Sequence, residues 1–363
     1  MNGGFYVHIP FCEKSCGYCN FFSFRASEEY EERYVLALKT EIRARRTREL
    51  TFDTIYFGGG NPAKLSESAI ASILETIRAT YSLTKDPEIT LEANPENLSE
   101  EKLLGLRALG VTRLSIGIQS FDMKNLEMLK RVRECDMSSR VDLALRIFKN
   151  VNLDLMYAIP GQDPADIRYN IDNIPEGIKH ISWYALSLEK GTMLYKKRLE
   201  LPWPDESTEL AMKELIVKEL ERKGYRHYEI SNYCLPGYES KHNLHYWKYD
   251  AYYGLGAGAA STYQGVRVEN TSNMKKYFSG NWHENIEKLT DTQVKNEWIM
   301  MRLRLKEGVV FEEYRGRFNG DFKEEYSPQM LRHNKFLKIE KHSVALSERG
   351  FDLYNEIVSD FFS

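Results

Sequence analysis

The sequence lacks several features that would assign it to a compartment or to a class of partner. Its 363 residues contain no apolar run long enough to span a lipid bilayer. It has only five cysteines, too few for a disulfide framework in a chain of this length, and no secretory segment precedes the first predicted strand. The formal net charge of -3 gives no basic footprint for nucleic acid. We therefore expect a cytoplasmic protein with no integral membrane segment and no nucleic-acid partner.

Three of the cysteines gather in one short polar loop. Cys12, Cys16 and Cys19 have the spacing C-x₃-C-x₂-C and follow a short apolar strand. Thiolates at this spacing can converge on an iron–sulfur cluster or on zinc. Zinc normally takes a fourth protein ligand and a second C-x₂-C or H-x₃-H pair, which the sequence lacks. An iron–sulfur cluster is favoured, ahead of zinc and of core cysteines. Cys135 and Cys234 have no neighbours at ligand spacing and are expected to be structural thiols.

Apolar segments alternate with helical patterns along the first half of the chain. Ser27 and Ser99 are predicted to cap two of the helices, because each precedes a helical pattern and its hydroxyl can accept a backbone N–H. Strands separated by helices indicate repeated βα units and a parallel sheet, either open or closed into a barrel. Six strands are predicted, at residues 4–9, 52–57, 88–93, 111–118, 151–157 and 181–188.

The pattern changes in the second half of the chain. Residues 231–263 are aromatic and glycine-rich and are predicted to be loop-like. A helix over 293–305, two further helical pieces, a hairpin over 336–347 and a final amphipathic helix resemble a winged-helix unit. Residues 291–363 carry twelve Lys and Arg against thirteen Asp and Glu, which does not favour DNA binding. We expect a structural lid or a partner-docking domain.

A glycine triplet and several strand-end polar residues are candidates for ligand binding. Residues 58–60 are three glycines after a strand, but no Gly-Lys-Ser/Thr follows, so they do not form a phosphate loop. Bare backbone there suits the ammonium and carboxylate of a methionyl group. Glu92, Gln119, Arg131 and Asp154 lie at or just beyond the ends of successive strands, where parallel sheets hold ligands. Acids suit an ammonium and ribose hydroxyls, and Arg suits a carboxylate, although any one of them could be a solvated charge.

The cysteine loop and the preceding residues 6–11 resemble the radical S-adenosylmethionine (SAM) enzymes, in which three thiolates leave one iron of a [4Fe-4S] cluster open. Residues 91–95, 114–121 and 152–162 resemble the branch that contains oxygen-independent coproporphyrinogen III oxidase (HemN) and its relative HemW. The resemblance implies an α/β fold: a partial (β/α)6 radical SAM barrel with a C-terminal helical, winged-helix-like domain. It further implies a cluster on Cys12, Cys16 and Cys19, and a SAM pocket lined by Tyr6, Tyr18, Gly59, Gly60, Asn61, Glu92, Gln119, Arg131 and Asp154. Asn61 stands where the family usually has threonine.

Two features resemble HemW more than the oxidases. Phe21 stands where the oxidases carry an additional cysteine, and the first predicted strand starts almost at Met1, whereas the oxidases have an N-terminal extension before it. Residues 242–247 read H-N-x-x-Y-W, which resembles the mark of the HemW haem chaperones. This implies haem binding with His242 as the axial ligand, and His245 as the alternative. Haem would then pass to acceptor proteins, respiratory haemoproteins among them.

Three functions are therefore open on the sequence. The favoured one is a HemW-like haem chaperone with a radical SAM core able to cleave SAM. The second is a coproporphyrinogen III oxidase, in which a 5′-deoxyadenosyl radical would abstract hydrogen from propionate side chains. The third is an iron–sulfur protein without turnover. The expected domains are a radical SAM core over 1–230, a connecting segment with the H-N-x-x-Y-W motif over 231–289, and a HemN-type C-terminal domain over 290–363.

Overall fold

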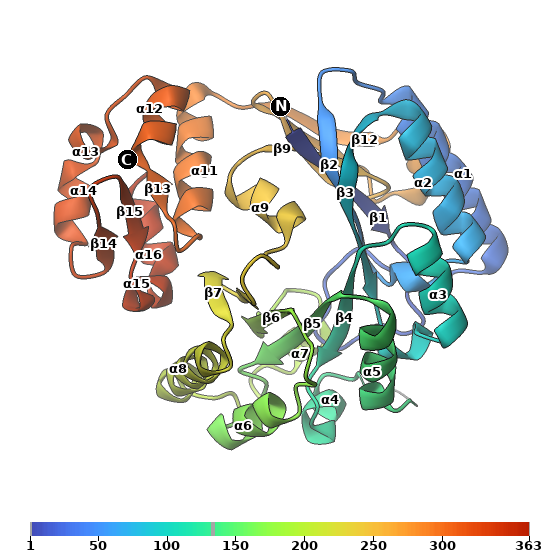
Figure 1. Ribbon diagram of the computed structural model, residues 1–363, viewed down its shortest axis with the longest axis horizontal. Helices are drawn as coiled ribbons and strands as arrows, with labels where there is room; N and C mark the ends of the chain where they lie inside the picture. Colours follow the sequence, from blue (N-terminus) through green and yellow to red (C-terminus); the bar gives the residue numbers. More distant parts are fainter. Residues whose placement is uncertain (1, 132–134, 363) are drawn as a thin grey trace.

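The computed structural model describes residues 2–131 and 135–362. Six parallel strands pair in chain order to form a curved sheet, and the helices between them cover its outer face (Figure 1). This half-open barrel is the predicted partial (β/α)6 architecture, and the prediction is confirmed. The strands are β1 (Asn2–Ile9), β2 (Thr51–Gly59), β3 (Ser82–Ala93), β4 (Arg113–Gln119), β5 (Asn150–Tyr157) and β6 (His180–Ala185). The helices are α1 (Glu28–Ala44), α2 (Glu67–Thr80), α3 (Glu100–Ala108), α4 (Met123–Met128), α5 (Met137–Ile147), α6 (Pro164–Asp172), α7 (Met193–Lys196) and α8 (Glu206–Arg222).

The helix starts follow from their capping residues. The hydroxyl of Ser27 accepts the N–H of Tyr30 at the start of α1, and Ser99 does the same for Lys102 at the start of α3. Both predicted caps are confirmed. Each satisfies a backbone N–H that has no partner within the helix.

The strands separate apolar from polar side chains with the period of two that a pleated strand imposes. On β4, Leu114, Ile116 and Ile118 are buried in the main core under the helices. The alternate residues Ser115 and Gln119 face the concave side, which we call the lumen, where they line a cavity. The other strands repeat this pattern, so the lumen is polar. Its side chains include Tyr6, Thr54, Tyr56, Glu88, Thr90, Glu92, Arg113, Asn152, Asp154, His180, Ser182 and Tyr184.

Residues 231–263 are not loop-like, and that prediction is wrong. They contain β8 (Asn232–Cys234), helix α9 (Lys241–Trp247), β9 (Ala251–Leu255) and β10 (Ala260–Tyr263). Helix α9 lies on the concave side of the sheet and contacts β1, β2 and β9 (Figure 1). Strand β9 pairs in parallel with β1, and the sheet continues through β10, β11 (Val266–Asn270) and β12 (His283–Lys288). Strand β8 pairs with β6 and with β7 (Arg226–Glu229) at the other edge, and α10 (Met274–Phe278) follows β11.

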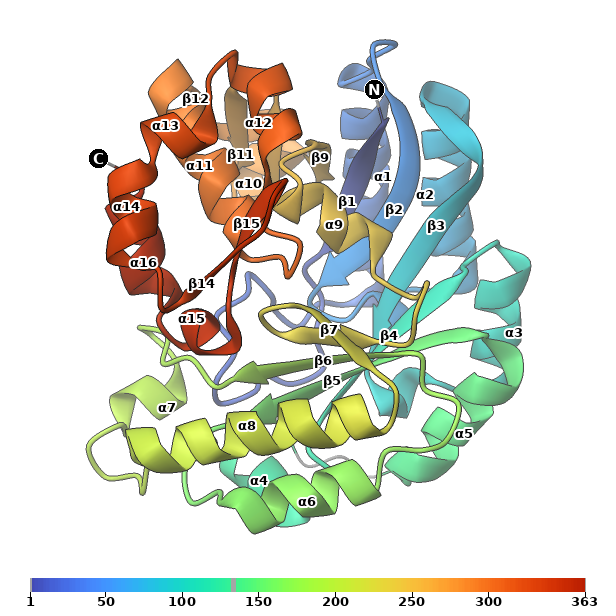
Figure 2. The same ribbon diagram turned by 60° about the vertical axis from the view of Figure 1, so that its left-hand side comes forward.

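The C-terminal residues build a second hydrophobic core around Trp298, Tyr314, Phe322 and Phe361. The predicted hairpin is present as β14 and β15, and β13 completes a three-stranded sheet. Figure 2 shows these helices and strands as a separate lobe beside the barrel. Residues 290–363 remain the proposed C-terminal domain. Its elements are α11 (Asp291–Leu303), β13 (Val309–Val310), α12 (Phe311–Phe318), α13 (Phe322–Glu325), α14 (Ser327–Arg332), β14 (Leu337–Ile339), β15 (Ser343–Leu346), α15 (Glu348–Asp352) and α16 (Tyr354–Asp360). In the described part of the chain, no helix combines the length and apolarity that crossing a bilayer requires.

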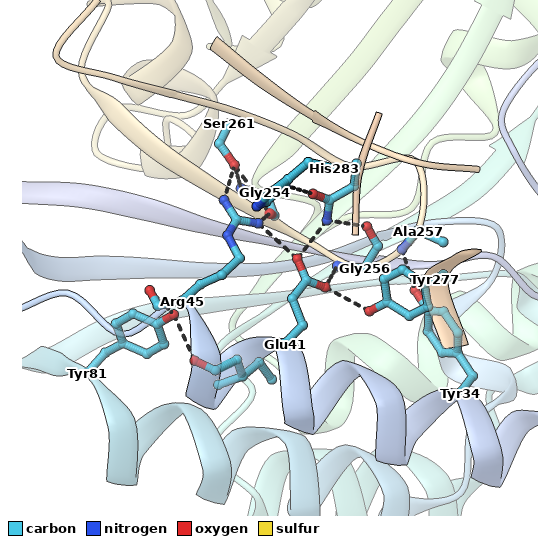
Figure 3. A network of polar contacts seen from close by, with 12 residues as sticks. Tyr34, Glu41, Arg45, Tyr81, Gly254, Gly256, Ala257, Ser261, Tyr277 and His283 are labelled. Carbon is cyan, nitrogen blue, oxygen red and sulfur yellow. Dashed lines mark hydrogen bonds and ion pairs between the residues drawn. The ribbon is translucent and has the colours of Figure 1, made fainter. Parts of the chain in front are cut away.

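A buried carboxylate attaches the β9–β12 extension to the barrel (Figure 3). Glu41 on α1 has an exposed fraction of 0%. It accepts hydrogen bonds from Arg45 Nη1 at 2.9 Å, Asn270 Nδ2 at 2.7 Å, the Tyr277 hydroxyl at 2.7 Å and the Gly256 N–H at 2.9 Å. The partners lie on α1, β11, α10 and the turn after β9. One carboxylate therefore holds four segments together.

We expect Glu41→Ala to lower the free energy of unfolding by about 3–5 kcal/mol, because it removes the carboxylate partner of the half-buried Arg45 and leaves the buried Tyr277 hydroxyl and Gly256 N–H without their acceptor. Urea unfolding followed by circular dichroism measures the change. Glu32→Ala removes an exposed carboxylate from the same helix and should change stability by less than about 0.5 kcal/mol. Equal effects of the two substitutions would contradict this role.

Candidate functional site

A cavity of about 520 Å³ opens at the carboxyl ends of the barrel strands. The cysteine loop forms one wall, and strand-end side chains form the others. Asn232 also belongs to this lining, and its Oδ1 is buried without a hydrogen-bond partner. Of the residues predicted from the sequence, the lining contains Cys12, Cys16, Cys19, Tyr18, Gly59, Gly60, Glu92, Gln119, Arg131 and Asp154.

The cysteine loop is fastened to its surroundings by backbone hydrogen bonds. The Cys12 N–H donates to the Phe24 carbonyl at 3.0 Å. Gly17 donates to the Leu129 carbonyl at 2.9 Å and accepts from the Leu194 N–H at 3.0 Å. The three thiols are therefore held at the mouth of the cavity, half-buried and open to it.

The donor set fits a metal cluster. Burial raises the pKa of the Cys12 and Cys19 thiols, and a bound metal would reverse this by favouring the thiolates. Across residues 2–131 and 135–362, no three His, Cys, Asp or Glu side chains converge closely enough to hold a single metal ion. A four-iron cluster is wider than an ion, and soft thiolates around one open cavity match its chemistry.

The glycine triplet lets the end of β2 lie directly against β1. Gly59 has a φ of +110°, and a Cβ there would lie 2.5 Å from the His8 ring. A Cβ on Gly60 would lie 2.7 Å from the Phe11 carbonyl oxygen. Bare backbone at this point forms part of the cavity wall, as the glycine pattern predicts.

The two carboxylates in the cavity already have hydrogen-bond partners. Glu92 accepts the Tyr56 hydroxyl at 2.8 Å and the Gly59 N–H at 3.1 Å. Asp154 accepts the Ser115 hydroxyl at 3.0 Å and the Asn152 amide at 2.8 Å. Burial raises the pKa of both carboxyls, and the nearby Asp154 helps to raise the pKa of Glu92 to about 7. Two carboxyls that are costly to ionise would be stabilised by a bound cation.

Arg131 and Gln119 also belong to the lining, beside the cysteine loop and at the end of β4. The Arg131 guanidinium donates to Asn94 Oδ1 at 2.7 Å and to the Gly117 carbonyl at 2.9 Å. Its Nη1 also lies 3.3 Å from both Cys16 Sγ and the Tyr18 hydroxyl. Gln119 ends β4 with a φ of 68°, a left-handed conformation that is costly for a residue with a side chain.

Three predicted residues lie behind the lining. The hydroxyl of Tyr6 lies 3.0 Å from His8 Nδ1. Asn61 is buried, and its amide donates to Asn97 at 2.5 Å, so it shapes the loop after the glycines. His242 is the third.

His242 has an exposed fraction of 1% and uses both ring nitrogens. Nδ1 lies 2.8 Å from Thr54 Oγ1, and Nε2 lies 2.7 Å from the Tyr246 hydroxyl. The ring stacks on Tyr56 at 5.0 Å. Iron ligation by His242 therefore requires one of these hydrogen bonds to break, while the other ring nitrogen can keep its partner. His245, the alternative, lies between Asp53 at 2.6 Å and Asp250 at 3.2 Å.

His245 is a charged anchor in this structure. Burial lowers its pKa, but the two carboxylates outweigh burial and raise the pKa to about 9. The imidazolium therefore holds α9 against β2 at neutral pH. A doubly hydrogen-bonded imidazolium is not available as a metal ligand.

Sequence reasoning missed several residues that build the site. Tyr56, Ser115, Asn152 and Tyr184 hold the predicted side chains in place, and Asn243 on α9 joins the lining. Period-two alternation inward from the strand ends would have placed the first four in the lumen. Asn243 lies within the H-N-x-x-Y-W motif, but its place in the lining could not be predicted because α9 was not predicted.

The Glu92 carboxyl should make stability depend on pH. Its ordinary pKa is 4.5, and in the folded protein it is about 7, so the folded chain binds this proton more tightly. Its contribution to stability is complete below about pH 4 and is lost as the pH rises through about 7. We expect Glu92→Gln to flatten the free energy of unfolding across this window in urea titrations. Glu101→Gln, at an exposed carboxyl on α3, should keep the wild-type slope.

Comparison with known proteins agrees with this geometry. The radical SAM superfamily model matches residues 6–174, and the HemN C-terminal domain model matches residues 289–353. "Heme chaperone HemW" of Lactococcus lactis is 33% identical, covering 98% of this chain and 96% of the relative. The protein of the same name from Bacillus subtilis is 34% identical, covering 98% of each chain.

A solved structure shares the fold. Coproporphyrinogen III oxidase (HemN) from Escherichia coli superposes with a TM-score of 0.86, covering 100% of this chain and 90% of that one, at 19% sequence identity. That identity supports the fold alone, whereas the curated relatives match at 30% or more over nearly the whole length. The chain therefore belongs to the HemW family of the radical SAM superfamily.

Proposed function

We propose that this protein is a haem chaperone that carries a [4Fe-4S] cluster, binds SAM and haem, and delivers haem to acceptor proteins. The observation that carries the proposal is the match to curated haem chaperones over 98% of the chain. It is supported by one cavity that contains the three cysteines, the glycine backbone and the strand-end carboxylates.

In this proposal Cys12, Cys16 and Cys19 hold the cluster, which supplies an open iron and an electron when bound. SAM lies across the strand ends. Glu92 and Asp154 accept hydrogen bonds from its ammonium and ribose hydroxyls, and the backbone of Gly59 and Gly60 borders its methionyl end.

Haem binding is the part of the proposal that separates a chaperone from an oxidase. Phe21, where the oxidases have cysteine, has an exposed fraction of 65% and reaches the cavity lining. An exposed phenylalanine adds apolar surface there and no metal ligand. Haem itself is proposed to bind at α9, with His242 as its axial ligand. Because His242 is held by Thr54 and Tyr246, ligation would rearrange α9 and should be slow compared with binding to an exposed histidine.

We expect the cluster to depend on each of the three loop cysteines. Replacement of any one by Ala should abolish the brown chromophore after anaerobic reconstitution with iron and sulfide, measured by absorbance and iron content. Cys135→Ala lies outside the C-x₃-C-x₂-C loop and should retain the full chromophore. A full cluster in the Cys16→Ala protein would refute the assignment.

We expect stoichiometric haem binding without coproporphyrinogen oxidation. Titration of the reconstituted protein with ferric haem should shift the Soret band. His242→Ala should change that spectrum or lower the occupancy, whereas His283→Ala, outside the motif, should not. Formation of protoporphyrinogen IX from coproporphyrinogen III would overturn the chaperone proposal and favour the oxidase.

A further inference from the structure

A buried arginine forms the floor of the lumen beneath the proposed SAM site. Arg113 begins β4, two residues before the cavity-lining Ser115, so alternation along the strand directs its side chain into the lumen. Its neighbours in register are Thr90 on β3 and Asn150 on β5. The exposed fraction of Arg113 is 2%. The guanidinium is therefore withdrawn from water inside the barrel.

This guanidinium lacks the partner that a buried cation normally has. Its Nε is buried without a hydrogen bond, and no carboxylate in the described ranges pairs with it directly. Thr90 Oγ1 and Asn150 Oδ1 beside it are also without partners. A buried charge is costly unless other charges compensate it. Three lumen carboxylates interact with it at longer range, namely Glu88, Glu92 and Asp154.

We propose that Arg113, one inward-facing position below Ser115 and its register partner Glu92, is a positioning residue that favours the ionised form of the Glu92 and Asp154 carboxyls, so that the strand ends can bind a cationic ligand. The inference rests on the proposed binding of SAM, whose sulfonium and ammonium are the cations in question. Arg113 acts through the two carboxylates and does not itself reach the cavity lining. This role would offset part of the cost of ionising two acids in one buried site.

The charges that face Glu92 and Asp154 determine whether the pKa of each carboxyl rises or falls. Burial and mutual repulsion raise their pKa values, while Arg113 lowers both. A guanidinium remains charged in proteins, so this effect is constant with pH. The other titratable groups that interact with Glu92 come from β1, β2, β6, α9 and the cysteine loop, namely Tyr6, Tyr56, Tyr184, Tyr246 and Cys19. His180 and His242 also interact with Arg113, which lowers the pKa of each.

The test compares three variants of the full chain. Arg113→Met and Arg113→Gln remove the charge, and Arg113→Lys retains it. Arg107→Met removes an exposed arginine on α3 and serves as the control. Circular dichroism and thermal melts establish that each variant is folded. Infrared difference titration without SAM, with Glu92→Gln to assign the signal, gives the ionisation midpoint of the Glu92 carboxyl.

We expect the Glu92 midpoint to rise by about one pH unit in the neutral variants and to stay near the wild-type value in Arg113→Lys and Arg107→Met. In reconstituted protein, SAM affinity at pH 7 should fall about tenfold in Arg113→Met and recover as the pH is raised. A folded neutral variant with an unchanged midpoint would overturn the inference.

Two further outcomes are decisive. If both neutral variants fail to fold, Arg113→Lys decides: a cation kept at this position must leave the Glu92 midpoint near its wild-type value, and a midpoint that rises by about one pH unit overturns the role. If the wild-type protein does not bind SAM, the proposed function fails. The infrared titration still tests whether Arg113 controls the two carboxyls, so the two failures can be told apart.

Discussion

The polar lumen is the constraint on which the rest of this structure depends. Strands β1 to β6 direct carboxylates, amides, hydroxyls and a guanidinium inward, and a half-open barrel would leave these groups facing bulk water on one side. Helix α9 closes that side. His242 extends from it to bond Thr54 and to stack on Tyr56, and the Tyr246 hydroxyl bonds the other ring nitrogen of His242, so that α9 completes hydrogen bonds of the lumen. Burial in this enclosure disfavours the charged form of a carboxyl, which is why the pKa values of Glu88, Glu92 and Asp154 are all raised.

Closure in turn depends on the attachment of the β9–β12 extension. Strand β9 pairs with β1, and the extension is held against α1 by Glu41 together with Tyr34 and Arg45. The Tyr34 hydroxyl donates to the His8 carbonyl at 2.7 Å and accepts the Ala257 N–H at 3.1 Å, so it joins β1 to the turn after β9. The network lies outside the lumen, yet it fixes the strand that follows α9 and so fixes α9 itself.

Much of the fold could be predicted because its signals are local. Apolar strands, serine caps and glycines at strand ends each act within a few residues, and polar side chains at the ends of parallel strands must meet at one edge. Helix α9 has no such signal. It is seven residues long, and its histidines and aromatics are satisfied by Thr54, Asp53 and Asp250, which only the folded chain brings near. Arg113 was missed for a related reason, because nothing local distinguishes a lumen arginine from a solvated charge at the start of a strand.

The H-N-x-x-Y-W motif on α9 contacts both the barrel and the C-terminal lobe. Its histidines and Tyr246 face the barrel, while Trp247 lies under the Arg304 guanidinium of the C-terminal lobe at 4.3 Å. The same guanidinium lies 3.5 Å from Glu229 at the end of β7, and the Lys306 N–H donates to the Tyr228 carbonyl at 3.0 Å. Tyr228 continues inward through its hydroxyl to His180, and His180 bonds Asn152, which holds Asp154. An unbroken set of contacts thus runs from the C-terminal lobe to a carboxylate of the cavity. Helix α9 thus contacts the lumen through His242 and the C-terminal lobe through Trp247, so its position depends on both neighbours.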